Sequence, residues 1–192
     1  MGGAIMRVLF GTFMERVMPG HVILSHGSDS GPDATKVSAL AKVAEAMGWT
    51  SERPDYRQDD ALGHAGCIAP RVARLHERIA ASSAQPVLVG SSMGSFVSGL
   101  ASLELPVAGL FLLATPATIP GSDFAFDVRL DVPTLLVHGW QDDVCPLDDI
   151  YEFAMRRSLP LLVLDDDHRL SAHVEAIARQ FGLFLEQLAA RT

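Results

Sequence analysis

Six short apolar runs, separated by stretches with helical spacing, set the strongest limit on what this chain can fold into. The runs are rich in Val and Leu and are bounded by Gly, Pro or Ser, as is typical of strands buried on both faces of a parallel sheet. They lie at His21–Ser25, Pro86–Gly90, Val107–Ala114, Pro133–His138 and Pro160–Leu164, with a weak, more polar one at Thr50–Pro54. Apolar residues recur on one helical face over residues 37–47, 72–79, 96–103 and 174–185. This alternation predicts an α/β fold, with a mostly parallel sheet of about six strands flanked by helices.

Length and charge narrow the class further. A chain of 192 residues, 48% of them hydrophobic and 20% charged, is typical of one globular domain, which we place at residues 21–192. Its 15 Lys and Arg against 23 Asp and Glu give a formal net charge of −8, and an acidic chain repels the phosphates of nucleic acids. No apolar run reaches the ~18–20 residues that a membrane span needs. We therefore expect a protein that binds neither nucleic acid nor membrane.

Residues 1–20 are expected to form a short lead-in to this domain. Glu15 and Arg16 interrupt its apolar residues and no small-residue cleavage site follows. We interpret the segment as a short strand, a poorly ordered lead-in or an upstream translation start, and not as a signal peptide. Two cysteines, Cys67 and Cys145, are too few for a disulfide framework and fit a reducing compartment. These features favour a cytoplasmic location.

Chemistry is expected where the strands end, because ligands of open α/β sheets bind beyond the carboxyl ends of the strands. The third run flows into Gly90-Ser91-Ser92-Met93-Gly94 and then into a helical pattern. This G-x-S-x-G places Ser92 at the tip of a sharp turn as a nucleophile, with the backbone N–H of Met93 at a helix N-terminus, where it can bind an oxyanion. The bare pattern is weak, and a Gly/Ser-rich turn without chemistry is the alternative. Its position between a strand and a helix favours the nucleophile.

An acid and a base follow two later runs. Asp142, with Asp143 as the alternative, comes just after the fifth run, where a carboxylate can hold and orient a histidine. His168 follows the last run and is the candidate general base, with His173 as a weaker alternative. Acidic residues are common at turns and helix caps without any catalytic role. The order Ser92, Asp142, His168, each after its own strand, nevertheless favours a catalytic triad.

The first run ends in a small-residue loop, His26-Gly27-Ser28-Asp29-Ser30-Gly31. Such a loop can present a second oxyanion donor, and the backbone N–H of Ser28 is our choice. A phosphate-binding loop fits poorly, because the segment lacks both G-x-G-x-x-G and a G-K-[ST] ending. The chain also lacks H-E-x-x-H and C-x-x-C, so we expect neither a metal nor an organic cofactor.

Together these segments resemble the α/β-hydrolase family over nearly the whole chain. The resemblance rests on HGSDSG at 26–31, GSSMG at 90–94, HGWQDDVCP at 138–146 and DDDH at 165–168. It implies Ser92 as nucleophile, Asp142 as acid, His168 as base, and the backbone amides of Met93 and Ser28 as the oxyanion hole. Two departures make the chain similar to the small, lidless members. The first two antiparallel strands of larger members are absent or reduced to residues 5–17, and only residues 117–131 occupy the place of a cap.

The resemblance implies a serine hydrolase that cleaves a small to medium carboxylic ester or thioester through an acyl-enzyme. The same triad could act on amide or C–C bonds or make a peracid, and a catalytically idle scaffold that binds a small molecule or a partner is the alternative from another class. Phe124 and Phe126 are the candidate substrate-binding residues. Aspartates of the strand-end loops predict a slower approach of anionic acyl groups. They are Asp29, Asp33, Asp142, Asp143, Asp165, Asp166 and Asp167.

Overall fold

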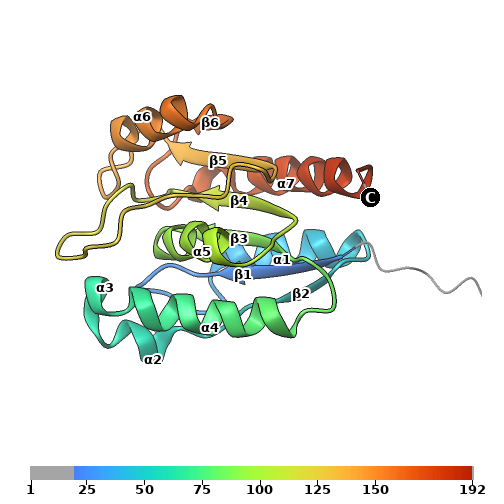
Figure 1. Ribbon diagram of the computed structural model, residues 1–192. Coiled ribbons are helices and arrows are strands. Elements are labelled where there is room, and N and C mark those ends of the chain that lie inside the picture. The colour runs from blue at the N-terminus through green and yellow to red at the C-terminus, as the bar shows by residue number, and fades with distance from the viewer. Residues whose placement is uncertain (1–19, 192) are drawn as a thin grey trace, which may run out of the picture.

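The computed structural model describes residues 20–191, and its centre is a six-stranded sheet in which every neighbouring pair of strands is parallel (Figure 1). The strands are β1 (His21–Ser25), β2 (Thr50–Glu52), β3 (Val87–Ser91), β4 (Gly109–Leu113), β5 (Thr134–Gly139) and β6 (Leu161–Leu164). Their order across the sheet is β2-β1-β3-β4-β5-β6. Each predicted run overlaps a strand, with β3 and β5 each ending one residue beyond the run, and the predicted fold class is confirmed. The expected lead-in lies outside the described residues, apart from Gly20.

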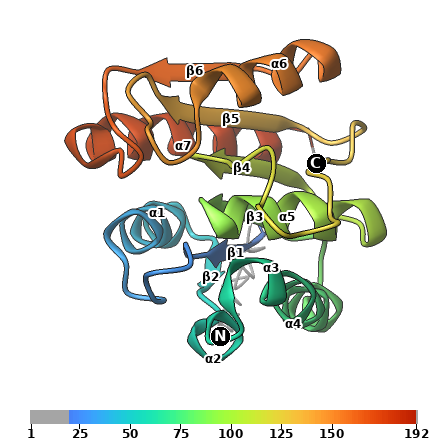
Figure 2. The ribbon, with the colours of Figure 1, turned by 90° about the vertical axis from the view of Figure 1, so that its left-hand side faces the viewer.

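The alternation of side chains along each strand builds two hydrophobic cores, one on each face of the sheet. On β1, Val22 and Leu24 face one helical layer and Ile23 faces the other, and β3 repeats this with Val89 and Leu88. Helices α1 and α7 cover the first face, and α4, α5 and α6 cover the second (Figure 2). Their bounds are α1 (Thr35–Ala46), α4 (Ile68–Ala81), α5 (Met93–Glu104), α6 (Leu147–Arg157) and α7 (Val174–Ala189). Because both faces are covered, the central strands β3 and β4 are buried along their whole length, whereas the edge strand β2 is polar and only partly buried.

The sequence patterns did not predict four of the observed elements: two short helices, a 3₁₀ turn and α6. The short elements are α2 (Arg57–Asp60), α3 (Gly63–Gly66) and η1 (Ser171–His173), which are too brief to leave a periodic apolar pattern. Helix α6 has acidic residues in its first turn and Arg156 and Arg157 in its last, a charge pattern that suits the helix dipole and could have predicted it. Within residues 20–191, no helix is both long and apolar enough to cross a membrane.

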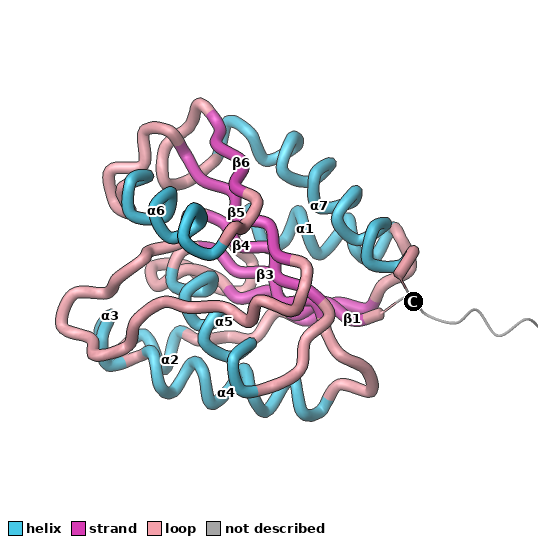
Figure 3. The backbone as a smooth tube through the Cα atoms, turned by 45° about the horizontal axis from the view of Figure 1, so that its top comes forward, coloured by secondary structure: helices cyan, strands magenta, loops and turns pink. Residues whose placement is uncertain are grey.

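The connection between β4 and β5, residues 114–133, contains neither helix nor strand (Figure 3). The ring of Phe126 anchors it by packing against Phe96 of α5 and Phe153 of α6, with ring centroids 5.7 and 4.8 Å away. Gly99 of α5 makes room for this ring, since a Cβ there would collide with it. The segment therefore lies along the second helical layer, and it forms no cap domain over the ends of the strands.

Candidate active site

Ser92 lies at the sharp turn between β3 and α5, in a strained backbone conformation. Its φ of 55° and ψ of −120° are values that residues other than glycine rarely adopt. Two glycines make the turn possible: a Cβ on Gly90 would clash with the carbonyl oxygen of Gly94, and one on Gly94 would clash with that of Ser25. The G-x-S-x-G spacing is therefore a steric requirement for packing β1, β3 and α5 together.

His168, in the loop after β6, joins Ser92 to Asp142, in the loop after β5. Its Nε2 lies 3.0 Å from the Ser92 Oγ, and its Nδ1 lies 3.0 and 2.8 Å from Oδ1 and Oδ2 of Asp142. When Nδ1–H donates to the carboxylate, Nε2 is free to accept the serine proton. The structure thus brings together the three side chains predicted from separate strand ends, in the geometry of a nucleophile, a base and an orienting acid.

Asp142 is the buried member of this chain of hydrogen bonds, with a side chain that is 0% exposed. Its Oδ1 accepts hydrogen bonds from the backbone N–H groups of Val144 (3.0 Å) and Cys145 (2.7 Å), and Nε2 of His138 lies 3.2 Å from its Oδ2. Burial by itself raises the pKa of Asp142, but hydrogen bonds from His138, His168 and Cys145 outweigh burial and hold this pKa well below its ordinary value. The group is therefore a carboxylate at neutral pH.

The structure also places the alternative acid and base. Asp143 is exposed, with its side chain outside the Asp142–His168 hydrogen bonds. His173 pairs instead with Asp166, whose Oδ2 lies 2.9 Å from its Nδ1. Of the two candidate acids and the two candidate bases, the structure therefore joins Asp142 and His168 to Ser92.

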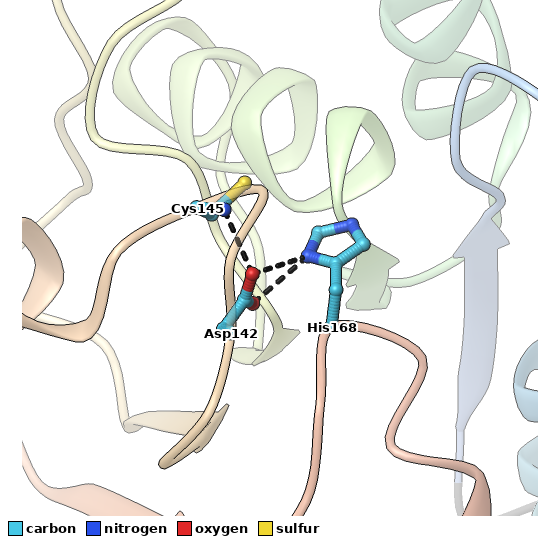
Figure 4. Close-up of side chains that lie close together, drawn as sticks. All are labelled: Asp142, Cys145 and His168. Atoms are coloured by element: carbon cyan, nitrogen blue, oxygen red, sulfur yellow. Dashed lines mark hydrogen bonds and ion pairs between the residues drawn. The ribbon is translucent and has the colours of Figure 1, made fainter.

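Cys145 lies beside this pair, and its backbone N–H rather than its sulfur is directed at Asp142 (Figure 4). Its Sγ, a carboxylate oxygen of Asp142 and a ring nitrogen of His168 lie within 4.8 Å of one another, a spacing compatible with a metal ion. Burial, followed by the charges of Asp142 and Asp149, raises the pKa of the Cys145 thiol to about 12. A protonated thiol is a poor nucleophile. The carboxylate of Asp142 and the ring of His168 are engaged by hydrogen bonds to each other and to Ser92, so the cluster fits the hydrogen-bonded chain.

The loop after β1 runs directly against the nucleophile. A Cβ on Gly27 would lie 3.5 Å from the Ser92 Cβ, which is van der Waals contact. Both predicted oxyanion donors, Ser28 and Met93, line the same cavity as Ser92. Met93 is the first residue of α5, where backbone N–H groups have no acceptor inside the helix.

A cavity of about 790 Å³ lies in front of Ser92 and His168. The β4–β5 connection supplies one of its walls through Pro116, Thr118, Ile119 and Pro120. Phe124 and Phe126 are not among the lining residues: Phe124 is exposed elsewhere and Phe126 is in the core. The expectation that they form the wall is wrong, because Phe126 buries its ring in the space left by Gly99 and turns this part of the segment away from the cavity.

Lys36 and Arg169, which belong to none of the predicted site motifs, also line the cavity. Nζ of Lys36 donates a hydrogen bond of 3.3 Å to the backbone carbonyl of His168. Burial lowers the pKa of Lys36 to about 8, although nearby carboxylates, Asp142 foremost, oppose the shift. A lysine in the first turn of a helix is electrostatically unfavourable, which marks Lys36 as unusual in the sequence but does not indicate its partner.

The charges at the cavity are therefore mixed. Of the aspartates expected around the site, those that line the cavity are Asp29, Asp143 and Asp167. The others are engaged elsewhere: Asp166 with His173, Asp165 with Gln141, Asp33 with Arg53, and Asp142 within the site. Since Lys36 and Arg169 line the same space, charges of both signs face an approaching acyl group, and the aspartates alone do not set the approach of anionic acyl groups.

No protein-family model and no curated protein sequence matches this chain. Among solved structures, it is similar to a candidate hydrolase of the alpha/beta superfamily from Xanthomonas campestris pv. campestris, with 44% identity over 88% of this chain and 99% of that chain and a TM-score of 0.83. An alpha-beta serine hydrolase homologue from Coxiella burnetii has 21% identity, covering 87% and 85% of the two chains, with a TM-score of 0.70. A serine hydrolase without a lid from Xanthomonas campestris has 17% identity, covering 89% and 83%, with a TM-score of 0.68.

The parallel sheet and the strained serine turn define a class of α/β proteins whose chemistry lies at the strand ends. This chain is 44% identical to the candidate hydrolase over nearly the whole of that protein, and it therefore belongs to the alpha/beta hydrolase superfamily. The two more distant neighbours support the same fold, and one of them is a protein without a lid.

Proposed function

We propose that the protein is a serine hydrolase that cleaves small to medium carboxylic esters or thioesters through an acyl-enzyme on Ser92. The observation that carries this proposal is the continuous chain of hydrogen bonds from Ser92 through His168 to the buried carboxylate of Asp142, at the edge of a cavity. A serine hydroxyl is a weak nucleophile by itself, and an adjacent base with an orienting acid activates it.

In the proposed mechanism, Nε2 of His168 takes the proton of Ser92 as Oγ attacks the acyl carbon. The oxyanion of the tetrahedral intermediate accepts hydrogen bonds from the backbone N–H groups of Ser28 and Met93. The imidazolium, stabilised by Asp142, returns its proton to the departing alcohol or thiol, which leaves the acyl-enzyme. His168 then activates a water molecule in the same way, and the acid is released.

A fluorophosphonate probe tests whether Ser92 is an activated nucleophile. We expect the folded protein to bind one phosphonyl group on Ser92, mapped by mass spectrometry of the labelled peptide, and the denatured protein to bind none. Denaturation separates Ser92 from His168, so the difference between the two samples reports the assembled site. A folded protein that leaves Ser92 unlabelled would favour the idle scaffold over the hydrolase.

Hydrolysis of p-nitrophenyl esters of increasing acyl length tests the size of the substrate. We expect kcat/KM to be highest for acetyl to butyryl esters and lower for the dodecanoyl ester. Each buried CH₂ group contributes about 0.8 kcal/mol, but the cavity has no cap and is lined by charged as well as apolar side chains. A long chain therefore stays partly in water. An optimum at dodecanoyl would contradict this assignment of the substrate.

We also propose that the substrate is a small molecule and that the protein works in a reducing compartment such as the cytoplasm. Cys67 and Cys145 are both free and buried. Burial raises the pKa of each thiol, so neither is primed for oxidation or exchange. Free cysteines of this kind are typical of proteins in reducing compartments.

A further inference from the structure

Arg71, on α4, is a fully buried cation that the mechanism above does not use. Its Nε and Nη2 donate to Oδ1 and Oδ2 of Asp60, each at 2.7 Å, and its guanidinium lies 4.7 Å from the centre of the Tyr56 ring. A buried charge is unfavourable unless it is paired and its hydrogen-bonding groups are satisfied. Asp60 satisfies one edge of the guanidinium, and the other edge faces the loop after β1.

Arg71 holds two successive carbonyl groups of that loop. Nη1 donates to the carbonyl of His26 at 2.8 Å, and Nη2 donates to that of Gly27 at 3.3 Å. The Gly27 oxygen also accepts hydrogen bonds from Nδ1 of His26 at 2.7 Å and from Oγ of Ser30 at 3.0 Å. Three donors therefore surround the oxygen of the peptide group that joins Gly27 to Ser28.

The direction of this carbonyl decides the direction of the Ser28 N–H. In a planar trans peptide, the C=O of one residue and the N–H of the next point in opposite directions, and residues 20–191 contain no cis peptide bond. Because the Gly27 oxygen faces the buried guanidinium, the Ser28 N–H points away from Arg71, and Ser28 lines the cavity whereas Arg71 is not among the lining residues. A flipped peptide would turn this N–H against the donors of Arg71 and His26.

The protonation of His26 supports the same arrangement. Its Nε2 accepts a hydrogen bond of 3.0 Å from the backbone N–H of Tyr56, so the imidazole is neutral and its proton is on Nδ1, the atom that donates to Gly27. Burial lowers the pKa of His26, which agrees with the neutral form. Arg71 and His26, two of the three donors to the Gly27 oxygen, are thus fixed by contacts of their own.

We propose that Arg71, held in place by Asp60, is a positioning residue for the oxyanion hole. It orients the Gly27–Ser28 peptide so that the Ser28 N–H is directed at the oxyanion before substrate binds. This role rests on the proposed function, since it needs an acyl oxyanion to stabilise. Arg71 touches no substrate itself, and it acts through the backbone of the loop.

The test compares an ester with its thionoester, in which sulfur replaces the carbonyl oxygen and accepts hydrogen bonds poorly. Values of kcat and KM are measured on p-nitrophenyl butyrate and p-nitrophenyl thionobutyrate for wild type and Arg71→Lys. Lysine keeps the charge but cannot hold Asp60 and both carbonyls in one fixed geometry. We expect kcat for the ester to fall about 10- to 100-fold. This is at or below the lower end of the ~10²–10³-fold loss that follows complete removal of one oxyanion donor, because the Ser28 N–H is misdirected and not removed. We expect KM to change little and kcat for the thionoester to fall far less.

Arg74→Lys is the matched control, because Arg74 lies one turn along α4 and pairs with Asp59 rather than with the loop. It is expected to leave both substrates unaffected. Thermal unfolding shows whether each variant is folded. If Arg71→Lys fails to fold, Asp60→Asn with Asp59→Asn as its control gives the same comparison, since Asp60 orients the guanidinium.

The outcomes separate this role from the proposed function. Equal losses on ester and thionoester, or no loss, would overturn the role of Arg71 and leave the proposed function intact. A wild-type protein that hydrolyses neither ester would overturn the proposed function, and the role of Arg71 with it. A selective loss on the ester, with the control unaffected, supports the role.

Discussion

Alanine in place of Ser92 is expected to lower kcat for ester hydrolysis by about 10⁴- to 10⁶-fold and to abolish the acyl-enzyme. The Ser92 Oγ, 3.0 Å from Nε2 of His168, is the atom that attacks in the proposed mechanism. Without it, only the oxyanion donors and substrate binding remain to accelerate the reaction. Alanine adopts the positive φ of this turn about as reluctantly as serine does. The free energy of unfolding should therefore change little.

Steady-state rates on p-nitrophenyl butyrate, together with thermal unfolding, check this expectation. Ser98→Ala is a matched control on the same helix, because the buried hydroxyl of Ser98 has no hydrogen-bond partner among the described residues. It is expected to retain both activity and stability. A folded Ser92→Ala protein that still hydrolysed the ester at the wild-type rate would show that Ser92 is not the nucleophile.

Asparagine in place of Asp142 is expected to lower kcat by about 10⁴-fold, although the two side chains have almost the same shape. The backbone N–H groups of Val144 and Cys145 both donate to Oδ1, so the amide oxygen of asparagine takes that position. The amide NH₂ then replaces Oδ2, which lies 2.8 Å from Nδ1 of His168. Because the amide oxygen, 3.0 Å from Nδ1, is already held by two backbone N–H groups, Nδ1 accepts a hydrogen bond from the nearer NH₂, and the ring proton moves to Nε2. In this tautomer His168 cannot take the serine proton.

Asp143→Asn is the control for this change, and we expect it to leave kcat nearly unchanged. Asp143 is the next residue in the same loop and is exposed, so its substitution alters the same net charge without touching the tautomer of His168. Parallel measurements of kcat on both variants give the comparison. If Asp143→Asn were the more damaging of the two, the assignment of Asp142 as the orienting acid would be wrong.

The strands and the serine turn could be predicted because their causes lie within a few residues of each other. A strand buried on both faces needs an unbroken apolar run, and the run ending at Gly90 shows this directly. The turn at Ser92 needs small residues two positions before and after it, since Gly90 and Gly94 lie where a Cβ would clash. Asp142 and His168 could be named because parallel strands bring the loops at their carboxyl ends to one edge of the sheet.

Other features could not be predicted, because they depend on partners far away in the chain. An aromatic side chain such as that of Phe126 is typical of a pocket wall. It is in the core instead, because Gly99 leaves a space for its ring. Lys36 reaches the His168 carbonyl across 132 positions, and Arg71 reaches that of His26 across 45. No local pattern encodes such pairs.

By itself, then, the sequence determined the α/β class, the strained serine turn and the candidates for base and acid. These follow from local sterics, apolar periodicity and the order of residues at strand ends. Only the tertiary structure decided which residues line the cavity, which charges balance there, and which buried cation holds the loop beside Ser92. Burial and pairing of a charged side chain depend on which segments the folded chain brings together, and a single sequence does not state those contacts.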